Sequence, residues 1–200
     1  LVVDRYNDIL VVQLLSAGLD AWTDVIVESL VSLTGCRGIV ARNDPAARAR
    51  EGLPREVKLL YGDVPKTVEV HEHGVRFLAA PWDGQKTGAF LDQRENRVLI
   101  GTHARGTALD CFAYHGSFAL HMAARAEHVT ALDISAPALA RVEAHAALNG
   151  LQNITSQVGD AFDVLRDWNR EGRRFDTIVV DPPAFAKSKA SLGGAERGYK

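Results

Sequence analysis

The stretch TALDCFAYHGSF (107–118) holds residue types whose order can build a ligand site. Its first half reads as a hydrophobic strand that ends at the carboxylate of Asp110. A short turn with one glycine, Gly116, then leads into a helix. A strand, a tight turn and a helix form nucleotide-like sites at the carboxyl end of a parallel sheet. We therefore predict such a site around Asp110 and Gly116.

A second stretch, FDTIVVDPPAF (175–185), predicts another wall of the same site. It reads as a buried strand that ends in Asp181-Pro182-Pro183, followed by the aromatic Phe185. Two successive prolines fix the direction of the loop, which can then present backbone carbonyls and the Asp181 carboxylate. Phe185 could stack on a flat base, an interaction of about 1–3 kcal/mol. The alternative is a proline-terminated strand with Phe185 in the core.

The turn at 112–117 selects among nucleotide-like ligands. A nicotinamide-binding turn needs GxGxxG, so that a pyrophosphate can sit against the helix N-terminus. This turn has one glycine and the bulky Phe112, Tyr114 and His115, so a diphosphate would fit poorly. A ligand without phosphate, a nucleoside joined to an amino acid, fits better. S-adenosylmethionine is such a ligand.

Two further acids end strands of the same pattern. HVTALD ends in Asp133, at a place where a carboxylate typically accepts hydrogen bonds from ribose hydroxyls. Asp160, in VGDAF, could accept from an adenine amino group, and it could equally cap the helix that begins near 161. Asp110 could likewise do no more than cap a turn. Three acidic strand ends in register nevertheless favour one shared site.

The segment GQKTGAFLDQREN (84–96) joins the two halves of the chain. Lys86 or Arg94 could hold a carboxylate, such as the methionine end of the cofactor. The alternative is a linker followed by an interdomain helix. The candidate cofactor contacts in this segment are Lys86, Thr87, Gly88, Phe90 and Arg94.

Before residue 105 the pattern predicts a smaller α+β domain of hairpins and a helix. The expected strands are 1–6, 9–15, 37–43, 67–72 and 75–80, with a helix over 20–34 that Gly35 ends and a loop or short helix over 44–56. We expect a central domain over 1–83 and a linker with an interdomain helix over 84–106.

After residue 106 the pattern alternates strand and helix, which predicts parallel strands with right-handed crossovers. The expected strands are 107–112, 128–133, 154–159 and 176–181, and the helices are 117–126, 136–149 and 161–171. Ser135 is the expected N-cap of the second helix, with Pro137 in its first turn and Gly150 after its end. The fold class is α/β, a Rossmann-like sheet over 107–200 of which four parallel strands are seen.

Composition sets broad limits. An apolar share of 46% and a charged share of 24% are ordinary for a globular protein. No apolar run approaches the ~20 residues of a membrane helix. Two cysteines without CxxC spacing favour a reducing, cytoplasmic setting. The histidines are scattered, so we expect no metal site. Oligomeric state stays open, a homodimer included.

The net charge of −2 argues neither for nor against a nucleic-acid partner. If the partner is RNA, the basic surface must be local or supplied by sequence outside these 200 residues. Lys187 and Lys189 could meet phosphates, although a short basic stretch is as often only solvated.

Four motifs in order carry a resemblance to a known family: KTGAFLDQREN, LDCFAYHGSFALHMA, VTALDISAPAL and VVDPPAFAKSKASL. Together they resemble the class I S-adenosylmethionine-dependent ribosomal RNA (cytosine-5) methyltransferases of the RlmI type. The resemblance implies a fragment that lacks the N-terminal PUA domain and the C-terminal part of the catalytic domain. It also implies ribosomal RNA as substrate, with C5 of a cytosine in the large subunit as the target.

The resemblance further implies roles for individual residues. Asp110, Phe112 and Gly116 would contact the cofactor, Asp133 its ribose and Asp160 its adenine. In this family a cysteine thiolate attacks C6 of the base, and that cysteine lies on a fifth strand that this chain does not reach. Neither Cys36 nor Cys111 matches it, so this piece alone is expected to be inactive.

The methyl-transfer centre and the RNA contacts also follow from the resemblance. Asp181, with Pro182 and Pro183, would face the methyl-transfer centre. The expected RNA contacts are Phe185, Lys187 and Lys189.

Two alternatives remain from the residues themselves. An acid followed by Pro-Pro and an aromatic residue is also a motif of enzymes that methylate exocyclic amines. Here Ala184 displaces the aromatic residue by one position. The chain could also be a non-catalytic RNA-binding module that keeps the fold. A dehydrogenase is excluded by the missing glycine fingerprint.

Overall fold

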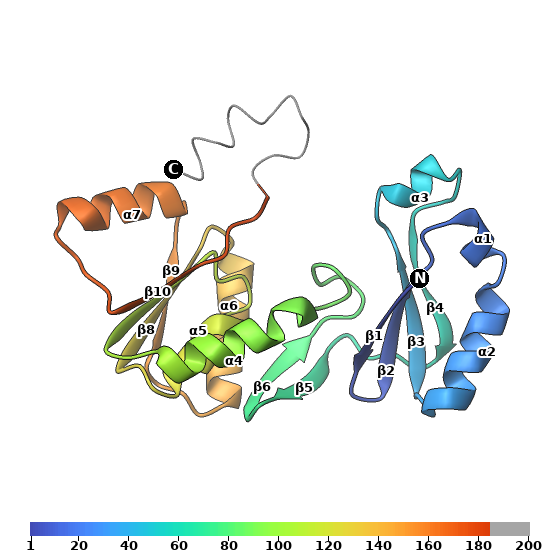
Figure 1. The fold of residues 1–200 in the computed structure, drawn as a ribbon, viewed down its shortest axis with the longest axis horizontal. Helices are drawn as coiled ribbons and strands as arrows, with labels where there is room; N and C mark the ends of the chain where they lie inside the picture. Colours follow the sequence, from blue (N-terminus) through green and yellow to red (C-terminus); the bar gives the residue numbers. More distant parts are fainter. Residues whose placement is uncertain (185–200) are drawn as a thin grey trace. The chain divides into compact units, whose positions relative to one another are not determined.

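The computed structural model describes residues 1–184 of the 200-residue chain. Contacts divide the chain into two compact units, Leu1–Arg94 and Glu95–Lys200. The division falls inside the segment 84–106 that the sequence pattern sets apart. Figure 1 labels the elements of both units.

The first unit is built on a four-stranded mixed sheet of order β1-β2-β3-β4. The β1–β2 and β3–β4 pairs are antiparallel, and β2–β3 is parallel. The four strands are β1 (Val2–Tyr6), β2 (Ile9–Gln13), β3 (Gly38–Asn43) and β4 (Glu56–Gly62). Helix α2 (Thr23–Thr34) makes the crossover between the parallel strands, and Gly35, in the left-handed region, ends it as expected.

One face of this sheet packs on α2. Leu10, Ile39 and Ala41 form the buried cluster there, with Leu30 and Val31 of the helix against it. Short helices α1 (Ala17–Asp20) and α3 (Ala47–Arg50) flank the sheet, and an antiparallel hairpin, β5 (Val68–Glu72) with β6 (Val75–Ala79), completes the strands. The hairpin and the first three large strands agree with the sequence pattern.

Strand β4 is a correction, because the sequence pattern predicts no strand over 56–62. Most of its side chains are half-buried or exposed. The charged Glu56 and Lys58 interrupt its apolar residues and pair with each other at 2.7 Å. Charged side chains on an edge strand hide the alternation that marks a strand, and they also oppose pairing with other chains.

The second unit is a four-stranded sheet of order β10-β7-β8-β9 in which every pair is parallel. Its strands are β7 (Thr107–Cys111), β8 (His128–Asp133), β9 (Ile154–Val158) and β10 (Thr177–Val180). Its helices are α4 (Arg94–His103), α5 (Ser117–Ala123), α6 (Ala136–Leu148) and α7 (Ala161–Arg170), with a 3-10 turn η1 (Leu91–Gln93) before α4. This is the expected alternation of strand and helix, and it confirms the α/β fold class.

Helices cover both faces of this sheet, as parallel strands require. On one face, Ala119 and Met122 of α5 and Val142 of α6 pack with Ala108 and Val129 of the strands. On the other face, α7 buries Ala161 and Trp168 against Leu109, Cys111 and Leu132. Figure 1 shows α7 on the opposite side of the sheet from α5 and α6.

Local signals set the ends of α6 as the sequence predicts. The Ser135 hydroxyl accepts a hydrogen bond from the Ala138 amide at 3.3 Å, with Pro137 in the first turn. Gly150 lies in the left-handed region just after the helix. Strand β10 lies at one edge of the described sheet, where the side chains of Ile178 and Val180 are 51% and 59% exposed.

Within residues 1–184, none of the helices has both the length and the apolar character that crossing a bilayer requires.

Gly38→Ala tests the close packing of β3 against the backbone of Asp63 in the first unit. A Cβ at Gly38 would lie 2.2 Å from the Asp63 carbonyl oxygen, and that oxygen belongs to backbone, which cannot rotate away. We expect a loss of about 1–3 kcal/mol in the free energy of unfolding, measured by urea titration. The control is Gly18→Ala, where nothing lies within 4 Å. Equal stabilities of the two variants would contradict the packing described.

Candidate functional site

The carboxyl ends of the parallel strands bring three of the predicted acids together. Asp110 lies near the end of β7, Asp133 ends β8, and Asp181 follows β10 directly. The ends of the three strands lie side by side, because Cys111 of β7 pairs with Leu132 of β8 on one side and with Val180 of β10 on the other. The negative charges of Asp133 and Asp181 both act on Asp110 and raise its pKa. The three carboxylates therefore form one electrostatic cluster.

Asp110 lies beneath the turn and is only 1% exposed. One carboxylate oxygen, Oδ2, accepts a hydrogen bond from the Ala119 amide at 2.9 Å. That amide is one of the unpaired donors of the first turn of α5, so Asp110 caps this helix from the preceding strand. Burial raises the pKa of Asp110 to about 7, and the charges of the two neighbouring acids add to the rise. Asp110 thus caps a helix, where the sequence offered the cap of a turn as the alternative, and a direct contact with a ligand stays a prediction.

The turn after β7 has an unusual backbone. Phe112 and Tyr114 have φ angles of 65° and 50°, a region that residues with side chains seldom occupy, and Gly116 has a φ of 80°. Each non-glycine residue held there costs on the order of 1–3 kcal/mol. A Cβ at Gly116 would lie 2.8 Å from the Val142 side chain, so only glycine fits that position. The surrounding structure must hold the turn.

Asp133 holds the turn to the neighbouring strand. Its Oδ2 accepts from the Tyr114 amide at 2.8 Å, and its Oδ1 accepts from the Ser135 amide at 2.8 Å. The side chain remains half-buried rather than buried. A carboxylate offers about four acceptor positions, so capacity remains on Asp133 for hydroxyl groups of a ligand.

Asp160 is the N-cap of α7. Its Oδ1 accepts from the amides of Phe162 and Asp163 at 2.8 and 3.4 Å. The residue is exposed at the end of β9. The capping role is confirmed, and the contact with an adenine amino group stays a prediction.

Two apolar residues at this edge escaped the sequence analysis. Ile134 and Phe162 are 71% and 43% exposed, although large apolar side chains usually prefer burial. The Gly159 amide donates to the Asp133 carbonyl at 3.0 Å, so the ends of β8 and β9 adjoin. The Phe162 ring stands edge-on to that of Phe112, with centroids 6.4 Å apart. A usable signal was a large apolar residue one position after Asp133 and two positions after Asp160.

A buried histidine pair, one ring from the turn and one from α6, was also missed. His115 and His145 are 4% and 1% exposed, with ring centroids 5.7 Å apart. His115 Nδ1 lies 3.0 Å from the Ser117 hydroxyl. Burial lowers the pKa of His115 to about 3, and the pKa of His145 is also lowered, first by burial. Both rings are therefore neutral at neutral pH.

Asp181 is exposed where β10 ends, Pro182 is half-buried and Pro183 is exposed. Phe185, Lys187 and Lys189 lie outside the described residues, so the proposed RNA contacts stay predictions.

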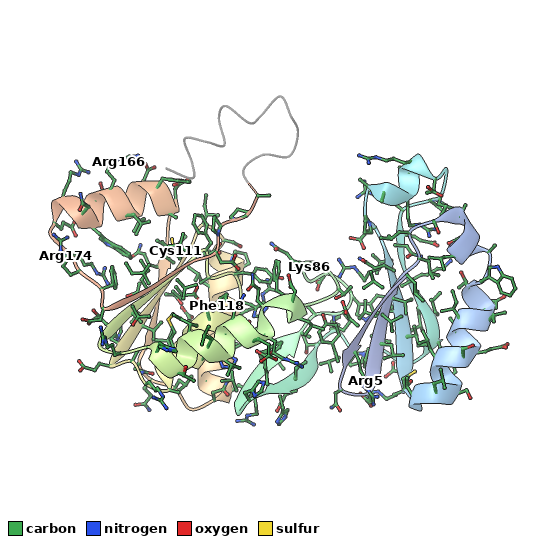
Figure 2. The ribbon with its side chains drawn as sticks, in the orientation of Figure 1. Arg5, Lys86, Cys111, Phe118, Arg166 and Arg174 are labelled. Atoms are coloured by element: carbon green, nitrogen blue, oxygen red, sulfur yellow. The ribbon has the colours of Figure 1, made fainter. Side chains whose placement is uncertain are left out.

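The cofactor contacts predicted in 84–96 belong to the first unit. The Lys86 ammonium pairs with Asp92 at 2.7 Å and lies 4.6 Å from the centroid of the Phe90 ring. Lys86 also has a positive φ of 55°. Arg94 lines a pocket of about 660 Å³ together with Arg5 and Glu69. Figure 2 shows Arg5 and Lys86 with their side chains.

Thr87 and Gly88 hold the first unit together. The Thr87 hydroxyl, 2% exposed, lies 2.9 Å from the Tyr6 hydroxyl and donates to Asp4 Oδ2 at 2.5 Å. Gly88 has a φ of 135°, and a Cβ there would lie 3.2 Å from Ala80 backbone atoms. A cofactor contact by either residue stays a prediction.

Cys36, just before β3, and Cys111, at the end of β7, are both buried. Burial, with the charge of Asp110 beside it, raises the pKa of Cys111 to about 11. A thiol attacks as its thiolate, so Cys111 is not a nucleophile at neutral pH. Cys111 instead packs in the core cluster beneath α7. Across residues 1–184, no three histidine, cysteine or acidic side chains are grouped as metal ligands.

The parallel sheet, the strained turn and the acidic strand ends define the class of nucleoside-binding α/β domains. Residues 41–198 match the family model described as S-adenosylmethionine-dependent methyltransferase. The sequence is 41% identical, over 205 residues, to the ribosomal RNA large subunit methyltransferase I of Shewanella amazonensis. That alignment covers 100% of this chain and 52% of the relative. The chain thus spans about half the length of the curated relatives it matches.

Two solved structures support the same assignment. A putative SAM-dependent methyltransferase from Streptococcus mutans has a TM-score of 0.79 and 26% identity, covering 95% of this chain and 51% of that one. A putative methyltransferase complexed with SAH has a TM-score of 0.78 and 27% identity, covering 94% and 49%. The chain belongs to the S-adenosylmethionine-dependent methyltransferase family.

Asp110→Asn tests the buried acid by its effect on stability. The native carboxyl keeps its proton up to about pH 7, whereas an unfolded aspartate loses it near its ordinary value of 3.8. Stability from this group is therefore complete below pH 3.8 and is lost as pH rises toward 7. The loss is at most on the order of 1.4 kcal/mol per pH unit.

Asparagine carries no charge, so the stability of Asp110→Asn relative to wild type should rise from pH 4 to pH 8. Urea titrations at several pH values measure this difference. Asp163→Asn, on the exposed side of α7, is the control and should show no such rise. A constant difference between Asp110→Asn and wild type would contradict the burial argument.

The burial of both cysteines predicts slow thiol labelling. A disulfide reagent such as DTNB should label neither Cys36 nor Cys111 within minutes at pH 8 in the native protein, because thiolates form and react only where exposed. Two thiols should react at once in concentrated urea. Rapid labelling of one thiol in the native protein would show that its site is open.

Proposed function

We propose that this chain holds S-adenosylmethionine at the carboxyl ends of β7, β8 and β9 and serves a methyltransferase that acts on ribosomal RNA. The family match and the name of the Shewanella relative support this function. The observation that carries it is the half-buried Asp133, which clamps the strained turn while keeping acceptor capacity for a ribose.

The residues present fit this cofactor. The turn presents one glycine and two aromatic rings, which suits a ligand without phosphates. The exposed Ile134 and Phe162 can lie against the two faces of an adenine base. The cofactor supplies a methyl group on a positively charged sulfonium. A cluster of three carboxylates complements that charge, because opposite charges a few ångströms apart attract strongly where water is scarce.

The proposed roles follow the geometry. Asp133 accepts from the ribose hydroxyls, and Asp160 accepts from the adenine amino group. Phe112 and Gly116 bring the turn against the ligand. Asp110 acts from beneath the surface, as a buried carboxyl that caps α5 and has no exposed face to meet the ligand.

The remaining proposed contacts come from the segment 84–94 and from the loop after β10. Lys86 and Arg94 are proposed to hold the methionine carboxylate, with Thr87, Gly88 and Phe90 shaping their segment. Asp181, Pro182 and Pro183 would form the rim that faces the base.

We propose C5 of a cytosine in the large ribosomal subunit as the methylated atom. Ala184 between Pro183 and the aromatic favours this target over an exocyclic amine. The attacking thiol of C5 chemistry is neither Cys36 nor Cys111, since both are buried. That thiol would have to come from sequence outside these 200 residues.

A homodimer of the whole protein stays a prediction.

Asp133→Ala should weaken binding of S-adenosylhomocysteine (SAH) at least tenfold, because it removes both the ribose acceptor and the clamp on the turn. Isothermal titration calorimetry of the 200-residue chain measures the affinity directly. Asp163→Ala is the matched control, an acid on the exposed face of α7 that we expect to bind like wild type. Unchanged affinity in Asp133→Ala would remove the proposed site.

A further inference from the structure

His145 is a buried polar side chain to which the proposed function gives no part. It lies on α6, 1% exposed, with its Nδ1 3.0 Å from the carbonyl oxygen of His115. A carbonyl oxygen can only accept a hydrogen bond. The Nδ1 atom must therefore carry the hydrogen, which fixes one tautomer of a neutral ring.

The carbonyl that His145 binds belongs to the most strained part of the turn. His115 stands between Tyr114 and Gly116, which both have positive φ angles, 50° and 80°. Such conformations persist only when neighbouring groups determine them more than once. Asp133 holds the Tyr114 amide from β8. His145, from α6, binds the carbonyl of the peptide between His115 and Gly116.

We infer that His145 is a positioning residue for cofactor binding: its Nδ1–H fixes the His115 peptide and so holds the 112–116 turn in the shape that meets the ligand. This inference rests on the proposed function. Asp133 from β8 and His145 from α6 then each hold one peptide group of the turn. Only Asp133 would touch the ligand.

The surroundings of His145 keep it neutral and therefore keep the tautomer. Burial lowers the pKa of His145 most, the hydrogen bond to the His115 carbonyl raises it in part, and Arg141, one turn earlier on α6, lowers it again, so that the pKa stays below its ordinary value. Arg141 itself lies with its guanidinium 4.6 Å from the centroid of the Tyr114 ring. The neighbouring His115 has its pKa lowered first by burial and then by His145, Arg141 and Arg97. No carboxylate is among the groups that shift either ring.

The test compares two substitutions of His145 by SAH titration calorimetry on the 200-residue chain. His145→Leu keeps the bulk and removes the donor, so we expect affinity to fall at least tenfold. His145→Asn keeps an N–H donor directed at the same carbonyl, so we expect affinity within threefold of wild type. The control is Leu139→Ala, which opens a cavity on the core face of α6. It should lower stability, keep the hydrogen bond from His145 to the His115 carbonyl, and bind SAH like wild type.

The outcomes separate the inference from the proposed function. If wild type fails to bind SAH, the proposed function falls. If wild type binds and His145→Leu binds within threefold of it, the inference falls while the function stands. Equal weakening in His145→Leu and Leu139→Ala would show a general stability effect and would also overturn it.

A measurement on the wild-type ring covers the case in which His145→Leu does not fold. Long-range ¹H–¹⁵N spectra of the imidazole distinguish the two neutral tautomers. We expect the Nδ1–H form of His145 with and without SAH. The Nε2–H form, or a mixture of the two, would overturn the inference without any substitution.

Discussion

The two hydrogen bonds that the Asp133 carboxylate accepts are the constraint on which this site depends. One bond reaches the Tyr114 amide of the turn after β7, and the other reaches the Ser135 amide before α6. A single side chain thus sets both the path of the turn and the start of the next helix. A carboxylate also attracts the partial positive charge of amide groups more strongly than a neutral acceptor does. The ends of β7 and β8 therefore behave as one rigid element.

Electrostatics gives this edge a second property. Asp110 is buried without a cationic partner among the groups that shift its pKa, and its acidic neighbours push that pKa upward. Burying a carboxyl in this way is unfavourable in isolation. It makes sense beside a positively charged ligand, because a nearby cation favours the ionised form. In the proposed function, Asp110 keeps its proton below about pH 7 while no ligand is bound. Binding of the sulfonium would favour loss of that proton, and the resulting carboxylate would attract the ligand.

Sequence reasoning found what depends on local pattern. It predicted the alternating strands and helices, the Ser135 cap and the acids at the strand ends, because periodicity and caps act over a few residues. It missed β4, whose charged edge residues hide the alternation. It also missed the left-handed backbone at Phe112 and Tyr114 and the His145 donor, because these depend on groups from β8 and α6 that only the folded chain brings close.

The positive φ angles of Phe112 and Tyr114 have an evolutionary consequence. Glycine or asparagine would relax the backbone at both positions, so a search for thermostable variants should select those replacements early. The chain instead keeps two large rings at the least comfortable positions of the turn. Under the proposed function, which sets Phe112 against the ligand, a replacement that relaxes this backbone would also remove a ligand contact, so directed evolution toward heat tolerance should erode binding.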